Sequence, residues 1–390
     1  MADIEKIQHL LAQYHLDGWL FTDFWGSDRI TREFLNLGER ISTRRLFYII
    51  PADSEPVKVL SVIEPLLLDH LPGRKLVYQG REGMDDALRQ ILQSGMRLAC
   101  QYSPGGNVPS ASTIDAGTME YLKSFGVDLV SSADLLQYFG AVLTKEQIQT
   151  HREAGVRIHR VLTGAFEWIR RRLDSHVYTD EWLLLNELKR RSEAEGLMMD
   201  EPPFLGVDAH MADPAYEPAP EGSSEIKEGS RLIIDIAGRL KQSDAVYYDV
   251  TWCMSVGRAP DEMYKRLFRI VWEAREAVRR RLELALASGQ YIKGCEADRE
   301  ARKVLEAYGL SKYIRHRTGH NIGTRCHGTG TNLDDYEAHD DRMLLAGTLF
   351  SVEPGIYTKD YGVRLEYDIY ITPEKKIEIS GPVQNEILVI

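Results

Sequence analysis

The chain has few cysteines and no segment with the length and apolarity of a membrane helix. Four cysteines, Cys100, Cys253, Cys295 and Cys326, are spread over 390 residues, and no two of them form a C-x-x-C pair. This usage excludes a disulfide framework, and we expect reduced thiols in core positions rather than catalytic groups. The longest apolar runs, such as residues 46–50, fall far short of the roughly 20 residues that a membrane helix needs. We therefore expect no membrane partner.

The chain also has no excess of basic residues. Lys and Arg number 48 against 59 Asp and Glu, which gives a net charge of −11. Nucleic acids bind basic faces of proteins, so we expect no nucleic-acid partner. The first ten residues carry acidic side chains and no apolar run, unlike a secretory signal. These features together predict a cytoplasmic protein.

What the chain does have is enough apolar material for two cores, since hydrophobic residues make up 43% of its length. The pattern changes near residue 140, and we expect one domain over residues 1–140 and a second over residues 144–390. In the first domain, helices alternate with short apolar runs typical of strands. It is predicted to be a small α/β domain with its own sheet, whose strands include residues 19–22, 45–50, 58–63 and 75–79.

The second domain is predicted to repeat one arrangement. A helix begins after Thr144, which stands at capping-box spacing from Gln147. Helical periodicity covers residues 144–173, 179–196, 261–288 and 294–308, and strands are expected at 230–240, 245–257, 347–357, 363–373 and 385–390. The order of helix pair, strands, helix pair, strands predicts an α/β (α+β) domain of two similar halves. The Pro/Gly/Ser-rich stretch over residues 208–228 is a candidate wall of an active site.

Two acidic residues interrupt consecutive apolar strands. Asp235 lies in LIIDIAG, and Asp249 lies in AVYYDVTW. A buried carboxylate is costly unless it is paired or bound to a metal. Either residue alone could be a salt-bridged residue at a strand end, but two in one hairpin can meet on one face.

Three further residues complete a possible ligand set. His320 stands in TGHNIG, Glu353 in FSVEPGIY and Glu366 in VRLEYDIYI. Each alone could be structural or solvent-facing, although the flanks of both glutamates are apolar. Four carboxylates and one imidazole suit divalent ions such as Mn²⁺, with Fe, Co or Zn as alternatives. Carboxylates can bridge two ions about 3.5–4 Å apart and activate a water between them. The residues therefore predict a hydrolase with two metal ions.

The segments HRTGHNIG, SVEPGIY and VRLE, in this order, resemble the pita-bread metallopeptidases, which include aminopeptidase P, prolidase, methionine aminopeptidase and the metal-free creatinase. The resemblance covers the whole chain. Residues 1–140 are similar to the creatinase-type N-terminal domain, and residues 144–390 are similar to the pita-bread catalytic domain with its pseudo-twofold halves. Because methionine aminopeptidases generally lack the first domain, the Xaa-Pro peptidase branch fits better.

The resemblance assigns a role to each residue. It implies that Asp235 is a bidentate ligand of one ion, that Asp249 and Glu366 bridge both ions, and that His320 and Glu353 bind the other. Glu353 would also transfer a proton. The remaining site residues implied by the resemblance are a substrate-contacting His316, a His327 that stabilises the oxyanion, and Arg364. For Arg364, a structural role as partner of the carboxylates stays open.

The implied reaction is hydrolysis of the peptide bond preceding proline by a metal-bridging hydroxide. The implied substrate is a proline-containing dipeptide or a longer peptide, with dipeptides slightly favoured. The implied cofactors are two divalent ions, manganese first, and a homodimer formed through the first domain is expected. Alternatives are a small-molecule hydrolase or lyase of the same fold, and a binding module that has lost catalysis.

Two departures from the family pattern stand out. Asp235 and Asp249 lie fourteen residues apart, where a shorter turn is common, and a longer hairpin can absorb the difference. In ADPAYEP, Ala215 stands where a site histidine is expected, and the nearby His210 is a candidate substitute. Ala215 has three explanations: natural variation with altered activity, an introduced inactivating substitution, or an enzyme that has left peptide chemistry.

Overall fold

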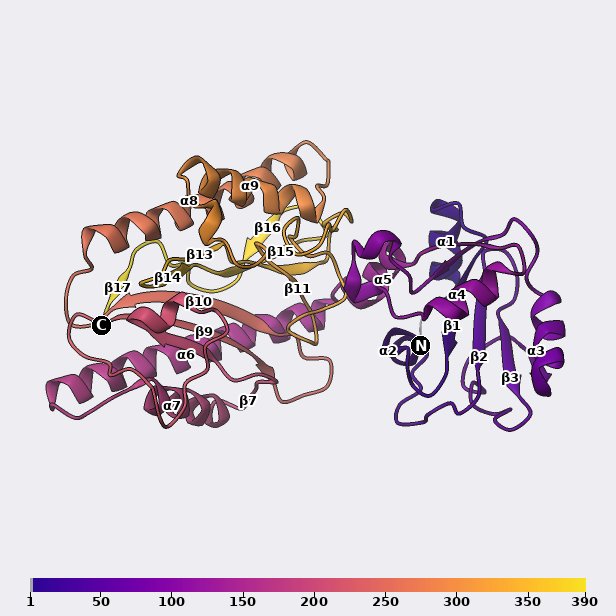
Figure 1. The fold of residues 1–390 in the computed structure, drawn as a ribbon, viewed down its shortest axis with the longest axis horizontal. Coiled ribbons are helices and arrows are strands. Elements are labelled where there is room, and N and C mark those ends of the chain that lie inside the picture. Colours follow the sequence, from indigo (N-terminus) through magenta and orange to yellow (C-terminus); the bar gives the residue numbers. More distant parts are fainter. Residues whose placement is uncertain (1–2) are drawn as a thin grey trace. The chain divides into compact units, whose positions relative to one another are not determined.

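The computed structural model describes residues 3–390, which form two compact units divided between Phe139 and Gly140 (Figure 1). The first unit contains one six-stranded sheet in the order β4-β3-β2-β1-β5-β6. Its strands are β1 (Gly18–Asp23), β2 (Leu46–Pro51), β3 (Val57–Ser61), β4 (Arg74–Tyr78), β5 (Arg97–Cys100) and β6 (Asp128–Ser131). Its helices are α1 (Ile4–Gln13), α2 (Arg29–Phe34), α3 (Gly80–Arg89), α4 (Ala116–Lys123) and α5 (Ala133–Gly140).

The first sheet is mixed and buried on both faces. Strand β2 runs antiparallel to β1 and β3, whereas the β3–β4, β1–β5 and β5–β6 pairs are parallel. Every residue of β1 is buried, and two separate apolar clusters pack against the sheet. The four strands named from the sequence are confirmed. Strands β5 and β6 were not predicted.

The second unit places helix pairs around its sheets. The helices are α6 (Lys145–Asp174), α7 (Glu181–Ala194), α8 (Glu262–Ala287) and α9 (Gly294–Ala307). Within this unit, α6 and α7 lie on one side of the strands, and α8 and α9 lie on the other (Figure 1). The predicted capping box is present, because Thr144 Oγ1 accepts a hydrogen bond from Gln147 N and Gln147 Oε1 accepts one from Thr144 N. The predicted order of helix pair, strands, helix pair, strands is confirmed.

The strands of the second unit form two larger sheets and one ribbon. One sheet has the order β17-β10-β9-β7, with β8 also paired to β9; another has the order β11-β12-β15-β16; β13 and β14 form the ribbon. The strands are β7 (Leu197–Met198), β8 (Phe204–Val207), β9 (Arg231–Leu240), β10 (Tyr248–Ser255), β11 (Asn321–Ile322), β12 (Leu349–Val352), β13 (Gly355–Tyr357), β14 (Gly362–Arg364), β15 (Tyr367–Ile371), β16 (Ile377–Ile379) and β17 (Leu388–Val389).

Each helix pair has its own apolar cluster. Helices α6 and α7 pack with residues of β9 and β10, and helices α8 and α9 pack with residues of β12 to β15. These clusters fix the positions of the strands that carry or adjoin Asp235, Asp249, Glu353 and Glu366. Among residues 3–390, no helix combines the length and apolarity required to cross a membrane.

Two predicted strands of the second unit are each divided in the structure. Residues 363–373 were expected to form one strand containing Glu366, but β14 ends at Arg364 and β15 begins at Tyr367. Residues 347–357 divide in the same way at Glu353 and Pro354. The chain leaves the β12–β15 sheet for the β13–β14 ribbon and then returns, so both glutamates lie at the points where the chain changes sheets.

Candidate metal centre

The β9–β10 hairpin places both aspartates on one face. Asp235 pairs with Thr251, and Asp249 pairs with Ala237, so the two carboxylates are diagonal neighbours. Side chains two residues apart along a strand share a face. Residues between the two aspartates extend β9 to Leu240 and form the turn, so a longer hairpin accommodates the fourteen-residue separation.

His320 and Glu353 are held by backbone hydrogen bonds and by one serine. His320 N donates to Ser351 Oγ at 2.9 Å, and Ser351 Oγ donates to Glu353 Oε1 at 3.2 Å. Glu353 N donates to Thr318 O at 2.7 Å. A Cβ added to Gly319 would lie 2.1 Å from Ser351 O, so glycine permits the close approach of these two segments.

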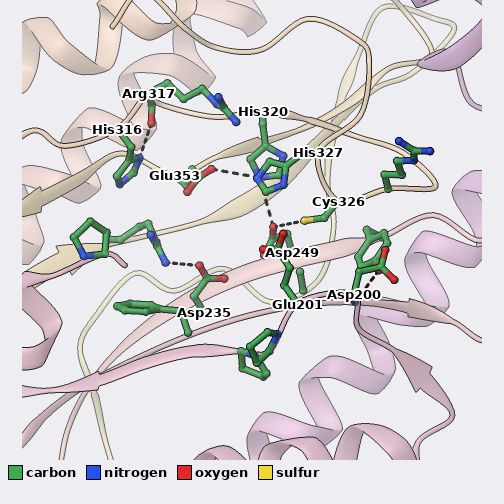
Figure 2. Close-up of a pocket in the computed structure, with 18 of the residues that line it drawn as sticks. Asp200, Glu201, Asp235, Asp249, His316, Arg317, His320, Cys326, His327 and Glu353 are labelled. Atoms are coloured by element: carbon green, nitrogen blue, oxygen red, sulfur yellow. Dashed lines mark hydrogen bonds and ion pairs between the residues drawn. The ribbon is translucent and has the colours of Figure 1, made fainter. Parts of the chain in front are cut away.

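All five predicted ligands converge in the second unit. One group of ligand atoms within 4.8 Å of one another comes from Asp235, Asp249 and Glu366, and a second comes from His320, Glu353 and Glu366. His320 Nε2 lies 3.6 Å from Asp249 Oδ2 and 3.4 Å from Glu353 Oε1 (Figure 2). Glu366 is common to these two groups, whereas Asp249 belongs to only one of them.

Burial makes this cluster of carboxylates unfavourable without a cation. Burial raises the pKa of Asp235 despite the neighbouring Arg364, and burial with the charge of Asp249 raises the pKa of Glu366. The buried atoms Asp249 Oδ1 and Glu366 Oε1 have no hydrogen-bond partner among residues 3–390. Unpaired buried oxygens of this kind are costly and are well suited to a divalent ion. The side chains present therefore fit a metal centre.

The charge of Asp249 also affects the two histidines nearest to it. Burial opposes charge on Asp249, but the hydrogen bond from His320 lowers the pKa of this carboxyl overall. Burial likewise opposes charge on His320, yet the hydrogen bond to Asp249 and the charge of Glu353 raise its pKa. Burial, with the neighbouring His320, lowers the pKa of His327, which favours a neutral imidazole.

Arg364 is the cation of the cluster and begins a chain of hydrogen bonds. Its guanidinium forms an ion pair with Asp235 and donates from Nε to Thr251 Oγ1 at 3.1 Å. Arg364 Nη1 lies 3.2 Å from Tyr357 Oη, which lies 2.7 Å from His316 Nε2. His316 Nδ1 lies 2.7 Å from the carbonyl oxygen of Arg317. Arg364 is thus a structural partner of the carboxylates, and both ring nitrogens of His316 already have protein partners.

Cys326 and His327 lie together beside the carboxylates. The rings of His327 and His320 have centroids 4.3 Å apart, and Cys326 Sγ lies 3.1 Å from Asp249 Oδ2 (Figure 2). The cysteines were predicted to be mostly buried, and this prediction is confirmed for three of the four. These three are buried, whereas Cys326 is partly exposed and lines the pocket. The sequence did not indicate that Cys326 lines the pocket, because only the fold brings this residue to Asp249.

The centre opens into a pocket of about 580 Å³. Its walls include His316, His320, His327, Glu353 and Arg364 from the predicted set. Asp235 and Asp249 of the predicted set also line it, and so does Pro214 from the loop over residues 208–228 that was predicted as a wall. The lining residues that were not predicted are Asp200, Glu201, Pro202, Pro203, Phe204, Ala237, Tyr247, Arg317, Arg325, Cys326 and Glu337. Sequence reasoning missed them because they come from loops and strand ends far apart in the chain.

The loop that carries Ala215 contributes only Pro214 to this pocket. Ala215 is exposed, and its N–H donates to Asp213 Oδ1 at 3.0 Å. His210, the proposed substitute, lies 2.8 Å from the buried Glu181 Oε2 and does not line the pocket. Its ring stacks on Tyr216. His210 therefore anchors the loop, and its proposed role as a substitute site histidine is not supported by its position.

Known proteins resemble this chain along most of its length. It is 26% identical over 361 residues to the probable dipeptidase PepE of Mycobacterium tuberculosis, covering 91% of this chain and 88% of that protein. Over 148 residues, 38% of each chain, it is 31% identical to the Xaa-Pro dipeptidase of Pyrococcus horikoshii. The crystal structure of dipeptidase PepE from Mycobacterium ulcerans superposes with a TM-score of 0.71 at 22% identity, covering 99% of this chain and 96% of that one.

The fold of the second unit is accordingly the pita-bread fold. The sequence profile of metallopeptidase family M24 matches residues 149–373, which is more than half of the chain and includes all five carboxylate and histidine positions of the centre. The chain belongs to metallopeptidase family M24.

Proposed function

We propose that this protein hydrolyses the peptide bond preceding proline, with Xaa-Pro dipeptides as its preferred substrates. The observation that carries the proposal is the convergence of four carboxylates and His320, with orphaned buried oxygens, at the base of one pocket. The Xaa-Pro dipeptidase of Pyrococcus horikoshii supports the choice of bond.

The proposed ligands are Asp235, Asp249, His320, Glu353 and Glu366. They would hold two divalent ions, with Mn²⁺ expected from the oxygen-rich set and Co²⁺, Zn²⁺ or Fe²⁺ as alternatives. When bound, such ions polarise the scissile carbonyl and lower the pKa of a water molecule.

The remaining chemistry falls to side chains of the chain itself. Hydrolysis adds a hydroxyl group to the carbonyl carbon, breaks the C–N bond and delivers a proton to the proline nitrogen. The Glu353 carboxylate accepts a proton from the attacking water and passes it to that nitrogen. His327, whose lowered pKa favours the neutral ring, donates an N–H hydrogen bond to the carbonyl oxygen as negative charge develops there.

The pocket also offers groups for the C-terminal proline of a dipeptide. Arg317 and Arg325 line it, and a guanidinium is well suited to bind a terminal carboxylate. Pro202, Pro203 and Phe204 supply apolar surface on the same pocket for a proline ring. These arginines would hold the terminal carboxylate of the substrate at a fixed distance from the metal centre. Because this distance suits only one residue after the cleaved bond, dipeptides are favoured over longer peptides.

The proposal is tested with purified protein that is stripped of metal and reloaded with Mn²⁺, Co²⁺ or Zn²⁺. Xaa-Pro, Xaa-Pro-Xaa and Xaa-Ala peptides are incubated with each form, and the products are identified by mass spectrometry. We expect metal-dependent cleavage of Xaa-Pro and slower cleavage of the tripeptide. Cleavage of Xaa-Ala at an equal rate would contradict proline specificity, and no cleavage of any peptide would refute the peptidase assignment.

One observation favours a second candidate, a small-molecule hydrolase or lyase of the same fold. The loop over residues 208–224 brings no imidazole to the pocket, because Ala215 is exposed and His210 bonds to Glu181. Turnover of small amides or sulfonium compounds by the reloaded protein, without turnover of Xaa-Pro, would support this candidate instead.

A further inference from the structure

Cys326 is a polar group beside the carboxylate cluster that the proposed reaction does not use. Its Sγ lies 3.1 Å from Asp249 Oδ2. The ligand atoms of Asp249, His320 and Cys326 all lie within 4.8 Å of one another, so the thiol belongs to a third potential ligand group. Within the described residues, none of the other three cysteines is part of such a group.

The spacing of these atoms resembles that of donors around a single ion. Ligand atoms on one tetrahedral ion, with bonds of about 2.0–2.3 Å, lie roughly 3.3–3.6 Å apart. Here Cys326 Sγ to Asp249 Oδ2 is 3.1 Å, His320 Nε2 to Asp249 Oδ2 is 3.6 Å, and His320 Nε2 to Glu353 Oε1 is 3.4 Å. Small shifts would therefore place Cys326 among the donors.

A second observation points to a cation at Asp249, the carboxylate that Cys326 contacts. Asp249 is only 5% exposed, and its other oxygen, Oδ1, has no hydrogen-bond partner in the described part of the chain. The thiol contact and the interaction with His320 both use Oδ2. The carboxylate that the thiol contacts therefore has one buried oxygen without a partner, which is unfavourable unless an ion binds it.

The backbone around Cys326 is fixed by Asn321. Gly328 N donates to Asn321 O, and Gly330 N donates to Asn321 Oδ1, both at 2.8 Å. Asn321 Nδ2 in turn donates to Leu349 O at 2.8 Å, at the start of β12. A Cβ on Gly328 would lie 2.3 Å from Asn321 Oδ1, so the glycine allows this tight packing. The thiol is thus held in position, and ligand pre-organisation of this kind favours metal binding.

We propose that Cys326 is a sixth protein ligand, on the His320 side of the metal centre, and that it shifts the metal preference from Mn²⁺ toward Zn²⁺ or Co²⁺. The inference rests on the metal centre of the proposed function. Thiolate is a soft donor, which Mn²⁺ accepts poorly and Zn²⁺ and Co²⁺ accept well. Binding forms a metal–sulfur bond and releases the thiol proton to solvent.

Co²⁺ spectroscopy on the full-length protein tests the inference. Co²⁺ bound to any protein site of low coordination gives ligand-field bands in the visible range, and a thiolate ligand adds a charge-transfer band in the near ultraviolet. We expect both in the metal-stripped wild-type protein after titration with Co²⁺. Cys326→Ser should keep the ligand-field bands and lose the charge-transfer band. Cys295→Ala, which removes a thiol buried in α9, is the matched control and should keep both.

Metal competition gives a second readout. In equimolar Zn²⁺ and Mn²⁺, followed by metal analysis of the desalted protein, Cys326→Ser should lower the ratio of bound Zn²⁺ to Mn²⁺ by about tenfold or more. Ligand-field bands without a charge-transfer band in the wild type would overturn the role of Cys326 and leave the metal centre standing. The absence of both bands would overturn the metal centre and, with it, the inference.

Discussion

At the scale of single residues, Asp249 and Glu366 are the side chains that join the parts of the centre. Asp249 belongs to the groups with Asp235 and with Cys326, and Glu366 belongs to both groups that lack the thiol. Each also has one buried oxygen without a partner among the described residues. For Glu366, whose pKa is raised by burial and by the charge of Asp249, removal of the charge should weaken metal binding but stabilise the metal-free protein.

Glu366→Gln tests the effects on metal binding and on the stability of the metal-free protein in one variant. Burial and the charge of Asp249 raise the pKa of Glu366, so the negative charge destabilises the metal-free fold. The neutral amide should raise the unfolding free energy of the metal-free protein by about 1 kcal/mol. Saturating metal, at a hundred times its Kd, stabilises a native protein by about 2.7 kcal/mol, and this gain should largely disappear in the variant.

Thermal unfolding with EDTA and with Mn²⁺ measures both effects. Glu306→Gln, on the exposed side of α9, is the matched control and should respond to metal like the wild type. A Glu366→Gln protein that gains as much stability from Mn²⁺ as the wild type would show that Glu366 is not a ligand.

Ala215→His tests whether the exposed loop position limits catalysis. Its neighbour Pro214 lines the pocket, so position 215 lies next to the pocket wall. We expect kcat/KM for Xaa-Pro dipeptides to rise about tenfold, because a positioned imidazole contributes to proton transfer or charge stabilisation. Ala219→His, at another exposed position of the loop, should leave it unchanged. An unchanged or lower kcat/KM in Ala215→His would show that the loop is adapted to other chemistry.

At the scale of elements, buried His151 joins α6 to two other segments. Its Nδ1 lies 2.6 Å from Tyr247 O, and its Nε2 lies 2.6 Å from Ser380 Oγ. Burial lowers the pKa of His151 from 6.5 to about 4. The unfolded chain therefore binds a proton at higher pH than the folded protein does.

This difference predicts a loss of stability in acid. The contribution of neutral His151 is fully present above about pH 6.5 and declines as the pH falls toward about 4, by up to about 3 kcal/mol at 1.36 kcal/mol per pH unit. His151→Gln should be less stable at pH 7.5 but should lose less stability between pH 6.5 and 4. Urea titrations in EDTA at several pH values measure how the unfolding free energy changes with pH. His176→Asn, just beyond the C-terminal end of α6, is the control. If the unfolding free energy of His151→Gln fell with pH as steeply as that of the wild type, buried His151 would not be the cause of the loss of stability in acid.

Local elements were predictable where all the residues that determine them lie in one short segment. The capping box of Thr144 and Gln147 and the paired aspartates of the β9–β10 hairpin are of this kind, because spacing alone fixes them. The break at Glu366 was not predictable, because the chain leaves one sheet for another there and both flanks are apolar. Cys326, Arg317 and Arg325 were not recognised, since only tertiary packing brings them to the pocket.

At the scale of the whole molecule, the candidate site depends on one unit alone. Every residue that lines the pocket lies within residues 140–390, and so do three of the five apolar clusters. The first unit has two clusters of its own, built on a separate sheet. A unit with its own core can fold alone, so the two units can be assigned different tasks.

We expect residues 140–390, expressed alone, to fold and to bind metal, and we assign dimer formation to the first unit. That unit exposes large apolar side chains, including Trp25, Ile63 and Leu66, which are 61%, 65% and 67% exposed, although the second unit also exposes Leu284, at 70%. Light scattering after gel filtration should give a dimer for the full chain and a monomer for residues 140–390, while both take up the same equivalents of Co²⁺ per chain. A dimeric fragment would place the contact in the second unit. A folded fragment that no longer binds Co²⁺ would show that the metal centre needs the first unit, although all of its proposed ligands lie in the second.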